Sequence, residues 1–343
     1  MKKVIFALAA VVALAACSKE QTVSFDKGAA IGFDTFVENS TRVGYSNDNM
    51  FADFAVYGVV TGDSDATAHI FDKEKVTKSG EGENATWTYT NTQYWINGAK
   101  YNFAAIAPHS NGAEGAFNGT STSLTAFENT GENDLLYAQN AQYTQSVEKV
   151  PFTFKHVLSK VKFTFKNGYN ATNTRIAVKN IHITNAHKTG NVVLGLDGSN
   201  NVTATWNNLV VDVTTPLDLN FGDAVAVIEQ GESKASANEK LLIPSSNYDY
   251  NVTFDVELYY KKGENDWTLI KTFNHTVGST LTFAPAFGNS YNVTAEITNA
   301  NIDENGPQSR IEFKVERIED WANGNTEDTN NDNVNDAYPF PLN

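Results

Sequence analysis

Apolar and polar residues alternate with a period of two along much of the chain. The clearest example is YNVTFDVELYY, whose apolar positions include Val252, Phe254, Val256 and Leu258. Successive side chains of a β-strand point to opposite faces of a sheet, so this pattern predicts a strand with one buried face. The segment RIEFKVE repeats the pattern, because Ile311, Phe313 and Val315 alternate with charged residues.

Strands are also predicted along most of the remaining chain. The candidate segments are FADFAVYGVV, AKYNFAAIAP, SKVKFTFKNG, RIAVKNIHIT, NVVLGL, EKLLIP, WTLIKTF and SYNVTAEIT, and turn-rich pieces such as TGDSD, HSNGAEG and LDGSN separate them. No long stretch after the N-terminal leader has the 3.6-residue apolar period of a helix. Each sheet has an apolar face that another sheet must cover, so the sequence predicts an all-β protein with two tandem antiparallel β-sandwich domains.

The N-terminal stretch MKKVIFALAAVVALAACSKE follows a different pattern. Lys2 and Lys3 precede an apolar run from Val4 to Ala16 that is shorter than the roughly 20 residues of a membrane-spanning helix, as in a secretion signal. Cys17 directly follows the predicted cleavage position, and LAAC resembles the lipobox of bacterial lipoproteins. We therefore predict that Cys17 becomes the acylated first residue of the mature chain. The alternative is an ordinary signal peptide with an incidental cysteine.

Composition narrows the classes of function. Cys17 is the only cysteine, so its acylation leaves no thiol for a disulfide, a nucleophile or a metal site. A formal net charge of −15 disfavours a nucleic acid partner, because the phosphate backbone would be repelled. The six histidines form no HExxH motif, and no GxSxG motif is present. The sequence therefore predicts neither an enzyme nor a resident cofactor.

The acidic C-terminal tail contains one candidate metal site. The segment EDTNNDNVNDAY has the D-x-N-x-D rhythm of calcium-binding loops. Its candidate ligands are Asp328, Asn330, Asp332 and Asp336. Asn333 stands where such loops place glycine, and Pro339 stands where they place a bidentate glutamate. Two interpretations stay open, a weak Ca²⁺ site and a solvated polar tail.

The predicted organisation has five parts. They are a signal peptide (1–16), a lipidated leader with the first strand (17–42), an N-terminal β-sandwich (43–155), a C-terminal β-sandwich (156–321) and an acidic polar tail (322–343). The junction in PFTFKHVLSK divides the chain into halves of ordinary domain size. His156 shares a strand face with Phe154 and Leu158, so we expect a buried structural ring that is hydrogen-bonded to backbone.

The order of several motifs resembles the fimbrillin family, the subunits of type V pili on Gram-negative anaerobes. The motifs are the lipobox at Cys17, STRVGY with Arg42, FAVYG, YWINGAKYNFAAIAP, FTFKHVLSKVKF around His156, LLIPS, FGNSYNVTAEIT and IEFKVERIEDW. The resemblance implies two transthyretin-like β-sandwiches, transport to the outer membrane as a lipoprotein, and polymerisation into a surface pilus that supports cell adhesion. The implied partners are other pilus subunits, the outer membrane through the lipid anchor, and a trypsin-like maturation protease.

The resemblance also implies assembly by donor-strand exchange, gated by cleavage after a basic residue. Arg42 is the only arginine before Arg175 and lies among turn-forming residues, although a solvated surface arginine is the alternative interpretation. The segment from Val23 to Phe36 is expected to pair as a strand in the first sandwich and to leave a groove when it is removed. Its core-covering residues would be Val23, Phe25, Ile31 and Phe33.

Two C-terminal segments are candidate donor strands. In NDAYPFPLN the apolar residues Tyr338, Phe340 and Leu342 alternate, but Pro339 and Pro341 each remove a hydrogen-bond donor from the strand. IEFKVERIEDW contains no proline and is the other candidate.

A surface glycan-binding lipoprotein is the competing function. Exposed aromatic rings on a sandwich would stack against sugar rings, and the candidate platform is Trp87, Tyr89, Tyr94 and Trp95. The same rings also fit a hydrophobic core.

Overall fold

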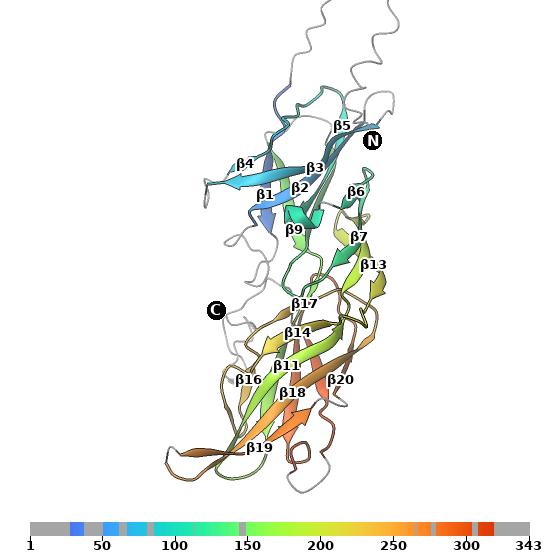
Figure 1. Ribbon diagram of the computed structural model, residues 1–343. Helices are drawn as coiled ribbons and strands as arrows, with labels where there is room; N and C mark the ends of the chain where they lie inside the picture. The colour runs from blue at the N-terminus through green and yellow to red at the C-terminus, as the bar shows by residue number, and fades with distance from the viewer. Residues whose placement is uncertain are drawn as a thin grey trace, which may run out of the picture.

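The computed structural model describes residues 28–37, 51–61, 67–80, 86–112, 114–143, 149–264, 266–275, 279–303 and 308–318. Within these ranges the regular structure is β-strand apart from one short helix, α1 (His109–Gly112) (Figure 1). No helix in the described ranges is long and apolar enough to cross a membrane. The predicted all-β sandwich fold is confirmed.

The first half of the chain forms a seven-stranded sheet in the order β1-β9-β8-β5-β2-β3-β4. Its strands are β1 (Phe33–Val37), β2 (Asp53–Thr61), β3 (Thr67–Ser79), β4 (Thr86–Thr88), β5 (Lys100–Ala107), β8 (Leu136–Tyr143) and β9 (Val150–His156). Both faces of this sheet are apolar. In β2, for example, Phe54 and Val56 enter one core, whereas Ala55 and Tyr57 enter another.

A four-stranded sheet covers one of these faces. It has the order β13-β12-β7-β6 and consists of β6 (Gly115–Phe117), β7 (Ser121–Glu128), β12 (Thr189–Leu196) and β13 (Val202–Val210). The β12–β13 hairpin pairs with β7, for example at Val192↔Leu124, and Val192 packs into the same core as Tyr57. The N-terminal sandwich therefore contains strands from both sides of the predicted boundary between residues 155 and 156. The division of the chain into two domains at this boundary stays a prediction.

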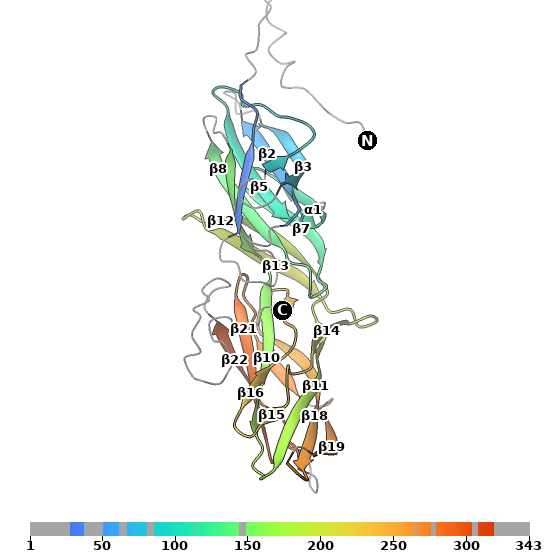
Figure 2. The same ribbon diagram turned by 90° about the vertical axis from the view of Figure 1, so that its left-hand side faces the viewer.

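The second half of the chain forms the other sandwich, which lies end to end with the first (Figures 1 and 2). One sheet has the order β16-β10-β21-β22, with β17 also paired to β10, and the other has the order β14-β11-β18-β19, with β15 on β11 and β20 on β18. The strands are β10 (Ser159–Gly168), β11 (Thr174–Ala186), β14 (Leu217–Gly222), β15 (Ile228–Glu229), β16 (Ser233–Ala235), β17 (Lys240–Leu242), β18 (Tyr248–Lys261), β19 (Trp267–His275), β20 (Thr280–Phe283), β21 (Ser290–Thr298) and β22 (Phe313–Ile318). Phe163, Val256 and Val293 are among the buried residues between the two sheets.

Two strand pairs are parallel, although antiparallel sheets were predicted. They are β1 with β9 and β10 with β21. The period-two pattern shows which residues face the core, but it carries no information about the direction of the neighbouring strand.

Candidate functional site

β1 lies at the edge of the seven-stranded sheet and runs along the outside of the N-terminal sandwich (Figure 2). It pairs in parallel with β9, from Phe33↔Val150 to Val37↔Phe154. This strand belongs to the early segment that the sequence predicted to pair with the first sandwich. Val23 and Phe25 of that segment lie outside the described residues.

The side chains of β1 fill an aromatic core. Phe33 is 2% exposed, and Ile31, just before the strand, is also buried. The ring of Phe33 lies 5.5–6.4 Å, centroid to centroid, from the rings of Phe54, Phe71, Tyr89, Phe103 and Phe152. These neighbours belong to other strands or to the segment after β4, so removal of β1 would leave a groove lined by aromatic rings.

The chain before β1 also contacts the segment that follows β4, the strand at the opposite edge of the sheet. The Ile31 backbone N–H donates to the Gln93 carbonyl at 2.9 Å, and the Trp95 N–H donates to the Ala29 carbonyl at 3.0 Å. The Tyr89 hydroxyl donates to the Ile31 carbonyl at 2.6 Å. We call the segment from Tyr89 to Trp95 the latch. β9 pairs with one side of β1, and the latch binds the chain just before β1. Together, β1 and the chain before it therefore close the seven-stranded sheet around its core.

The predicted glycan platform is wrong, because most of its rings belong to this core. Trp95 is 5% exposed and packs 4.8 Å from the ring of Tyr101. Trp87 packs 5.0 Å from the ring of Phe54, and Tyr89 contacts Phe33. Only Tyr94 of the four is exposed, at 39%. The rings are needed to cover the open face of the seven-stranded sheet, which no other sheet covers in the described residues.

His156 lies at the end of β9, where the two sandwiches meet, and is 3% exposed. Its Nδ1 lies 2.7 Å from Oδ2 of Asp134, so a carboxylate, rather than the expected backbone group, binds this nitrogen. The other oxygen of Asp134 accepts the Leu135 N–H at 2.9 Å. Asp134 is distant in sequence and belongs to the loop before β8, so no local pattern could identify this partner.

Further hydrogen bonds tie the two sandwiches together beside His156. Asn129 Nδ2 donates to the Leu241 carbonyl at 3.2 Å, and the Leu241 N–H donates to the Gly131 carbonyl at 2.9 Å. Gly131 has φ +80°, and a Cβ there would lie 2.4 Å from Leu219 Cδ2. Lys240 pairs with Glu132. The sandwiches are therefore joined by specific contacts as well as by the chain.

Buried charges lie on the C-terminal side of this junction. Lys160 and Lys162 of β10 are fully buried, and Glu239, just before β17, is also buried. Burial raises the pKa of Glu239 to about 7, although the charges of Lys160 and Lys162 oppose the shift. Burial also lowers the pKa of Lys160, against the attraction of Glu239 and Asp134. These groups make the stability of the junction sensitive to pH.

β22 is the second edge strand of interest and pairs antiparallel with β21, from Ser290↔Ile318 to Ala295↔Phe313. Phe313 packs 5.9 Å from the ring of Phe163 and is partly buried. This strand lies in IEFKVERIEDW, the second of the two predicted donor segments. The first, NDAYPFPLN, lies outside the described residues.

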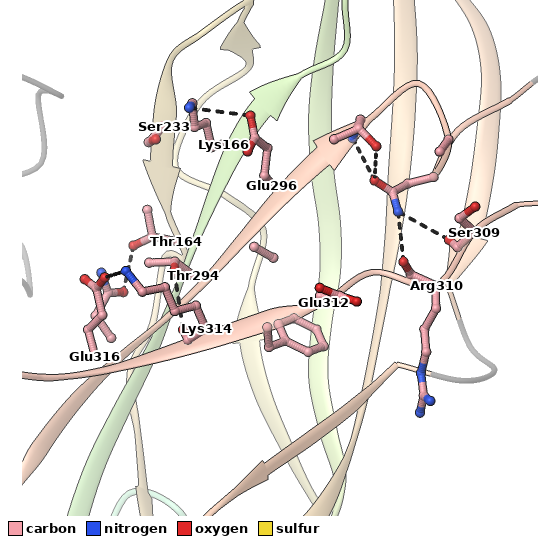
Figure 3. Close-up of a pocket in the computed structure, with 16 residues that line it drawn as sticks. Thr164, Lys166, Ser233, Thr294, Glu296, Ser309, Arg310, Glu312, Lys314 and Glu316 are labelled. Atoms are coloured by element: carbon pink, nitrogen blue, oxygen red, sulfur yellow. Dashed lines mark hydrogen bonds and ion pairs between the residues drawn. The ribbon is translucent and has the colours of Figure 1, made fainter.

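The polar side chains of β22 form one wall of a hollow of about 750 Å³ on the outer face of its sheet (Figure 3). Lys314 of β22 pairs with Glu316 at 2.6 Å, and Lys166 of β10 pairs with Glu296 of β21 at 3.4 Å. These ion pairs are solvent-exposed and contribute little to stability. Because β22 supplies one wall, this hollow depends on β22 remaining paired with β21.

The remaining predicted sites lie outside the described residues. They are the lipidation residue Cys17, the cleavage residue Arg42 and the calcium candidates Asp328, Asn330, Asp332 and Asp336. These assignments stay predictions. Among the described residues, no cluster of three or more His, Cys, Asp or Glu side chains could hold a metal ion.

Comparisons with solved structures give distant similarities. One is to a protein named for a role in cell adhesion from Bacteroides uniformis, with 17% identity over 85% of this chain and 98% of that chain and a TM-score of 0.44. A similarly named protein from Bacteroides ovatus has 14% identity, coverage of 86% and 98%, and a TM-score of 0.46. The fimbrial anchor protein Mfa2 from Porphyromonas gingivalis has 9% identity, coverage of 85% and 100%, and a TM-score of 0.35.

No curated protein matches the chain at a significant level. A family model does match it, and this match extends over residues 41–321. That range begins between β1 and β2 and ends beyond β22. It therefore includes every strand of both sandwiches in the described residues except β1. The chain therefore belongs to the fimbrillin-like family.

Proposed function

We propose that this protein is a structural subunit of a type V pilus, exported as an outer-membrane lipoprotein through Cys17 and assembled by protease-gated donor-strand exchange. The observation that carries the proposal is β1, an edge strand whose Phe33 fills an aromatic core formed by the rest of the sandwich. Membership of the fimbrillin-like family supports the pilus role. The role is structural rather than catalytic.

Cleavage after Arg42 is the proposed gate. Arg42 lies between β1 and β2 in the chain, so a cut there separates these strands covalently without removing any hydrogen bond of β1. β1 then becomes a dissociable strand, and a strand from another subunit competes for its place. The lipid on Cys17 is on the β1 side of the cut. A shaft subunit therefore loses its lipid with β1, whereas an anchor subunit stays uncut and tethered.

β22 is the better supported donor of the two predicted segments. Its Ile311, Phe313 and Val315 have the same spacing as Ile31, Phe33 and Thr35, the inward residues of β1 and of the chain just before it. An isoleucine and a phenylalanine that become buried in the groove contribute roughly 3 to 6 kcal/mol before entropic costs. The edge position of β22 makes it accessible for such an exchange.

Variants at Arg42 test the proposal. Arg42→Ala should give folded, lipidated monomers that do not polymerise when a trypsin-like protease is added. Arg42→Lys is the matched control, because it keeps a basic residue that such a protease accepts, and it should polymerise. SDS-resistant ladders on a gel report the polymer. Efficient ladder formation by Arg42→Ala would remove Arg42 from the mechanism.

A further inference from the structure

We propose that the groove left by β1 selects its partner by steric fit at the latch. The preferred partner is an extended segment that runs parallel to β9 and has glycine three positions before an aliphatic residue. A phenylalanine follows two positions after the aliphatic residue, and a small residue follows two positions after that. This inference rests on the proposed strand exchange, because it specifies which strand the groove accepts.

Gly28 carries the steric part of the argument. A Cβ at this position would lie 2.3 Å from the backbone oxygen of Trp95 and 3.2 Å from its carbonyl carbon. The restriction is steric, because the backbone of Gly28 does not adopt the left-handed conformation. The clashing atoms are backbone atoms, which cannot move aside as the end of a flexible side chain can.

The Trp95 backbone is itself held in place. Its N–H donates to the Ala29 carbonyl at 3.0 Å, and its buried ring packs against Tyr101 and Phe103. A side chain at position 28 would have to push this backbone away, which would break the bond to Ala29. Close contact between the incoming strand and the latch therefore requires a residue without a Cβ.

The hydrogen bonds of the latch cannot distinguish one sequence from another. The Tyr89 hydroxyl donates to the Ile31 carbonyl and accepts the Gln93 N–H at 3.3 Å, and Gln93 in turn accepts the Ile31 N–H. On the strand side, all these bonds use backbone atoms. Any strand that approaches closely enough could make them, so selection depends on the glycine and on the side-chain pockets.

The pockets set the rest of the pattern. Ile31 and Phe33 are buried in the aromatic core, and Thr35 is buried opposite Phe152 of β9. Phe36, on the other face of the strand, is 52% exposed, so the groove imposes no requirement on the side chain at this position. The inward positions therefore require an aliphatic residue, a phenylalanine and a small residue.

The chain's own β22 fits the pockets but not the latch. When Ile311 is aligned with Ile31, the position of Gly28 is occupied by Gln308, which has a Cβ. A second copy of this chain should therefore bind more weakly through β22 than a subunit whose donor strand has glycine there. The groove consequently favours assembly with a different subunit over assembly with itself.

Peptide binding to the cut protein tests this rule. A recognition sequence for an unrelated specific protease is inserted after position 42 of the full chain, and Arg42→Ala removes the proposed natural site. After cleavage, fluorescent peptides compete with β1 for the groove. The probes are residues 28–37 (GAAIGFDTFV) with or without Gly28→Ala, and residues 308–317 (QSRIEFKVER) with or without Gln308→Gly.

Gly28→Ala should weaken the first peptide at least tenfold, and Gln308→Gly should strengthen the second at least tenfold. Equal affinities within twofold for either pair would overturn the rule. Because the cut does not use Arg42, this result is independent of whether Arg42 is the natural gate. Efficient polymerisation of the Arg42→Ala variant would refute the proposed gate and leave the peptide result unchanged.

Hydrogen exchange in the uncut protein provides a second test, which does not require a peptide to enter the groove. Gly28→Ala should speed exchange at the Ile31 and Trp95 amides at least tenfold. The matched control is Gly198→Ala, because a Cβ at Gly198 meets no atom within 4 Å, and it should leave both amides unchanged. Unchanged exchange in Gly28→Ala would contradict the steric role of this glycine even if no peptide binds.

Discussion

β1 and β22 are both edge strands with the same spacing of inward residues, but they are held differently. β1 pairs with β9, the chain just before it is bound by the latch, and Phe33 is buried. Among the described residues, β22 pairs with β21 alone, and its Phe313 and Val315 are only partly buried. The comparison indicates that β22 is held less firmly than β1. In the proposed mechanism, β1 is replaced only after a cut in the chain.

The largest expected difference between the two strands is in the stability that is lost when their inward phenylalanine, Phe33 or Phe313, is replaced by alanine. Phe33→Ala should lower the free energy of unfolding by about 3 to 5 kcal/mol, because it leaves a cavity among five rings. Phe313→Ala should cost roughly 1 to 2 kcal/mol, because less of its ring is removed from water. Urea denaturation measures both. Equal losses would show that the two strands are held alike.

The His156–Asp134 contact should stabilise the junction between the sandwiches without changing how firmly β1 or β22 is held in its sheet. His156→Gln should cost about 1 to 3 kcal/mol, the effect of a disrupted buried hydrogen bond. The control is His182→Gln, because His182 has a similar contact with Asp218 at 2.8 Å but both side chains are more exposed. Urea denaturation would give the two values. A larger loss for His182→Gln would mean that the junction contact is not structural.

Glu239 should make stability depend on pH near the sheet that contains β22. The folded protein holds the Glu239 proton up to a pKa of about 7, above the ordinary glutamate value of 4.5. The native state therefore binds more protons than the unfolded state between these values, and stability should fall as pH rises through this window. Glu239→Gln should flatten this part of the profile. Thermal unfolding from pH 4 to 8 measures it, and identical profiles would exclude Glu239 as the source.

The smallest expected effect concerns the latch. Tyr89→Phe keeps the ring against Phe33 but removes the hydroxyl that binds the Ile31 carbonyl, so it should cost about 0.5 to 1.5 kcal/mol. Hydrogen exchange should increase at Ile31 and remain unchanged in β22. Faster exchange in both strands would mean that the substitution acts on the whole fold rather than on β1.

Many of the strands and their inward faces could be predicted from the sequence because a period of two is a local property. Phe313 and Val315 were identified in this way, whereas Ile31 and Phe33 were named as core-covering residues of the early segment, in the assembly that the family resemblance implies. Strand direction and strand partners are not local, so the parallel β1–β9 pair and the pairing of the β12–β13 hairpin with β7 could not be predicted.

The details of the candidate site depend on contacts between distant segments. Asp134 binds His156 from another loop, and Gly28 is required because Trp95 passes close to its backbone. The aromatic segment from Trp87 to Trp95 has the composition of both a core and an exposed platform. Only the position of the open sheet face, which depends on the whole fold, shows that its rings are mostly buried.

A disulfide between β1 and β9 tests most directly whether β1 must leave for the subunit to assemble. Phe36 and Thr153 are direct partners across the parallel pair, and both side chains are exposed, so Phe36→Cys with Thr153→Cys would join the strands without disturbing the core. After cleavage at Arg42, the oxidised double variant should remain monomeric, and adding a reductant should restore polymerisation to the level of the single-cysteine variants. Polymerisation of the oxidised variant at the level of the single-cysteine variants would contradict strand exchange at β1.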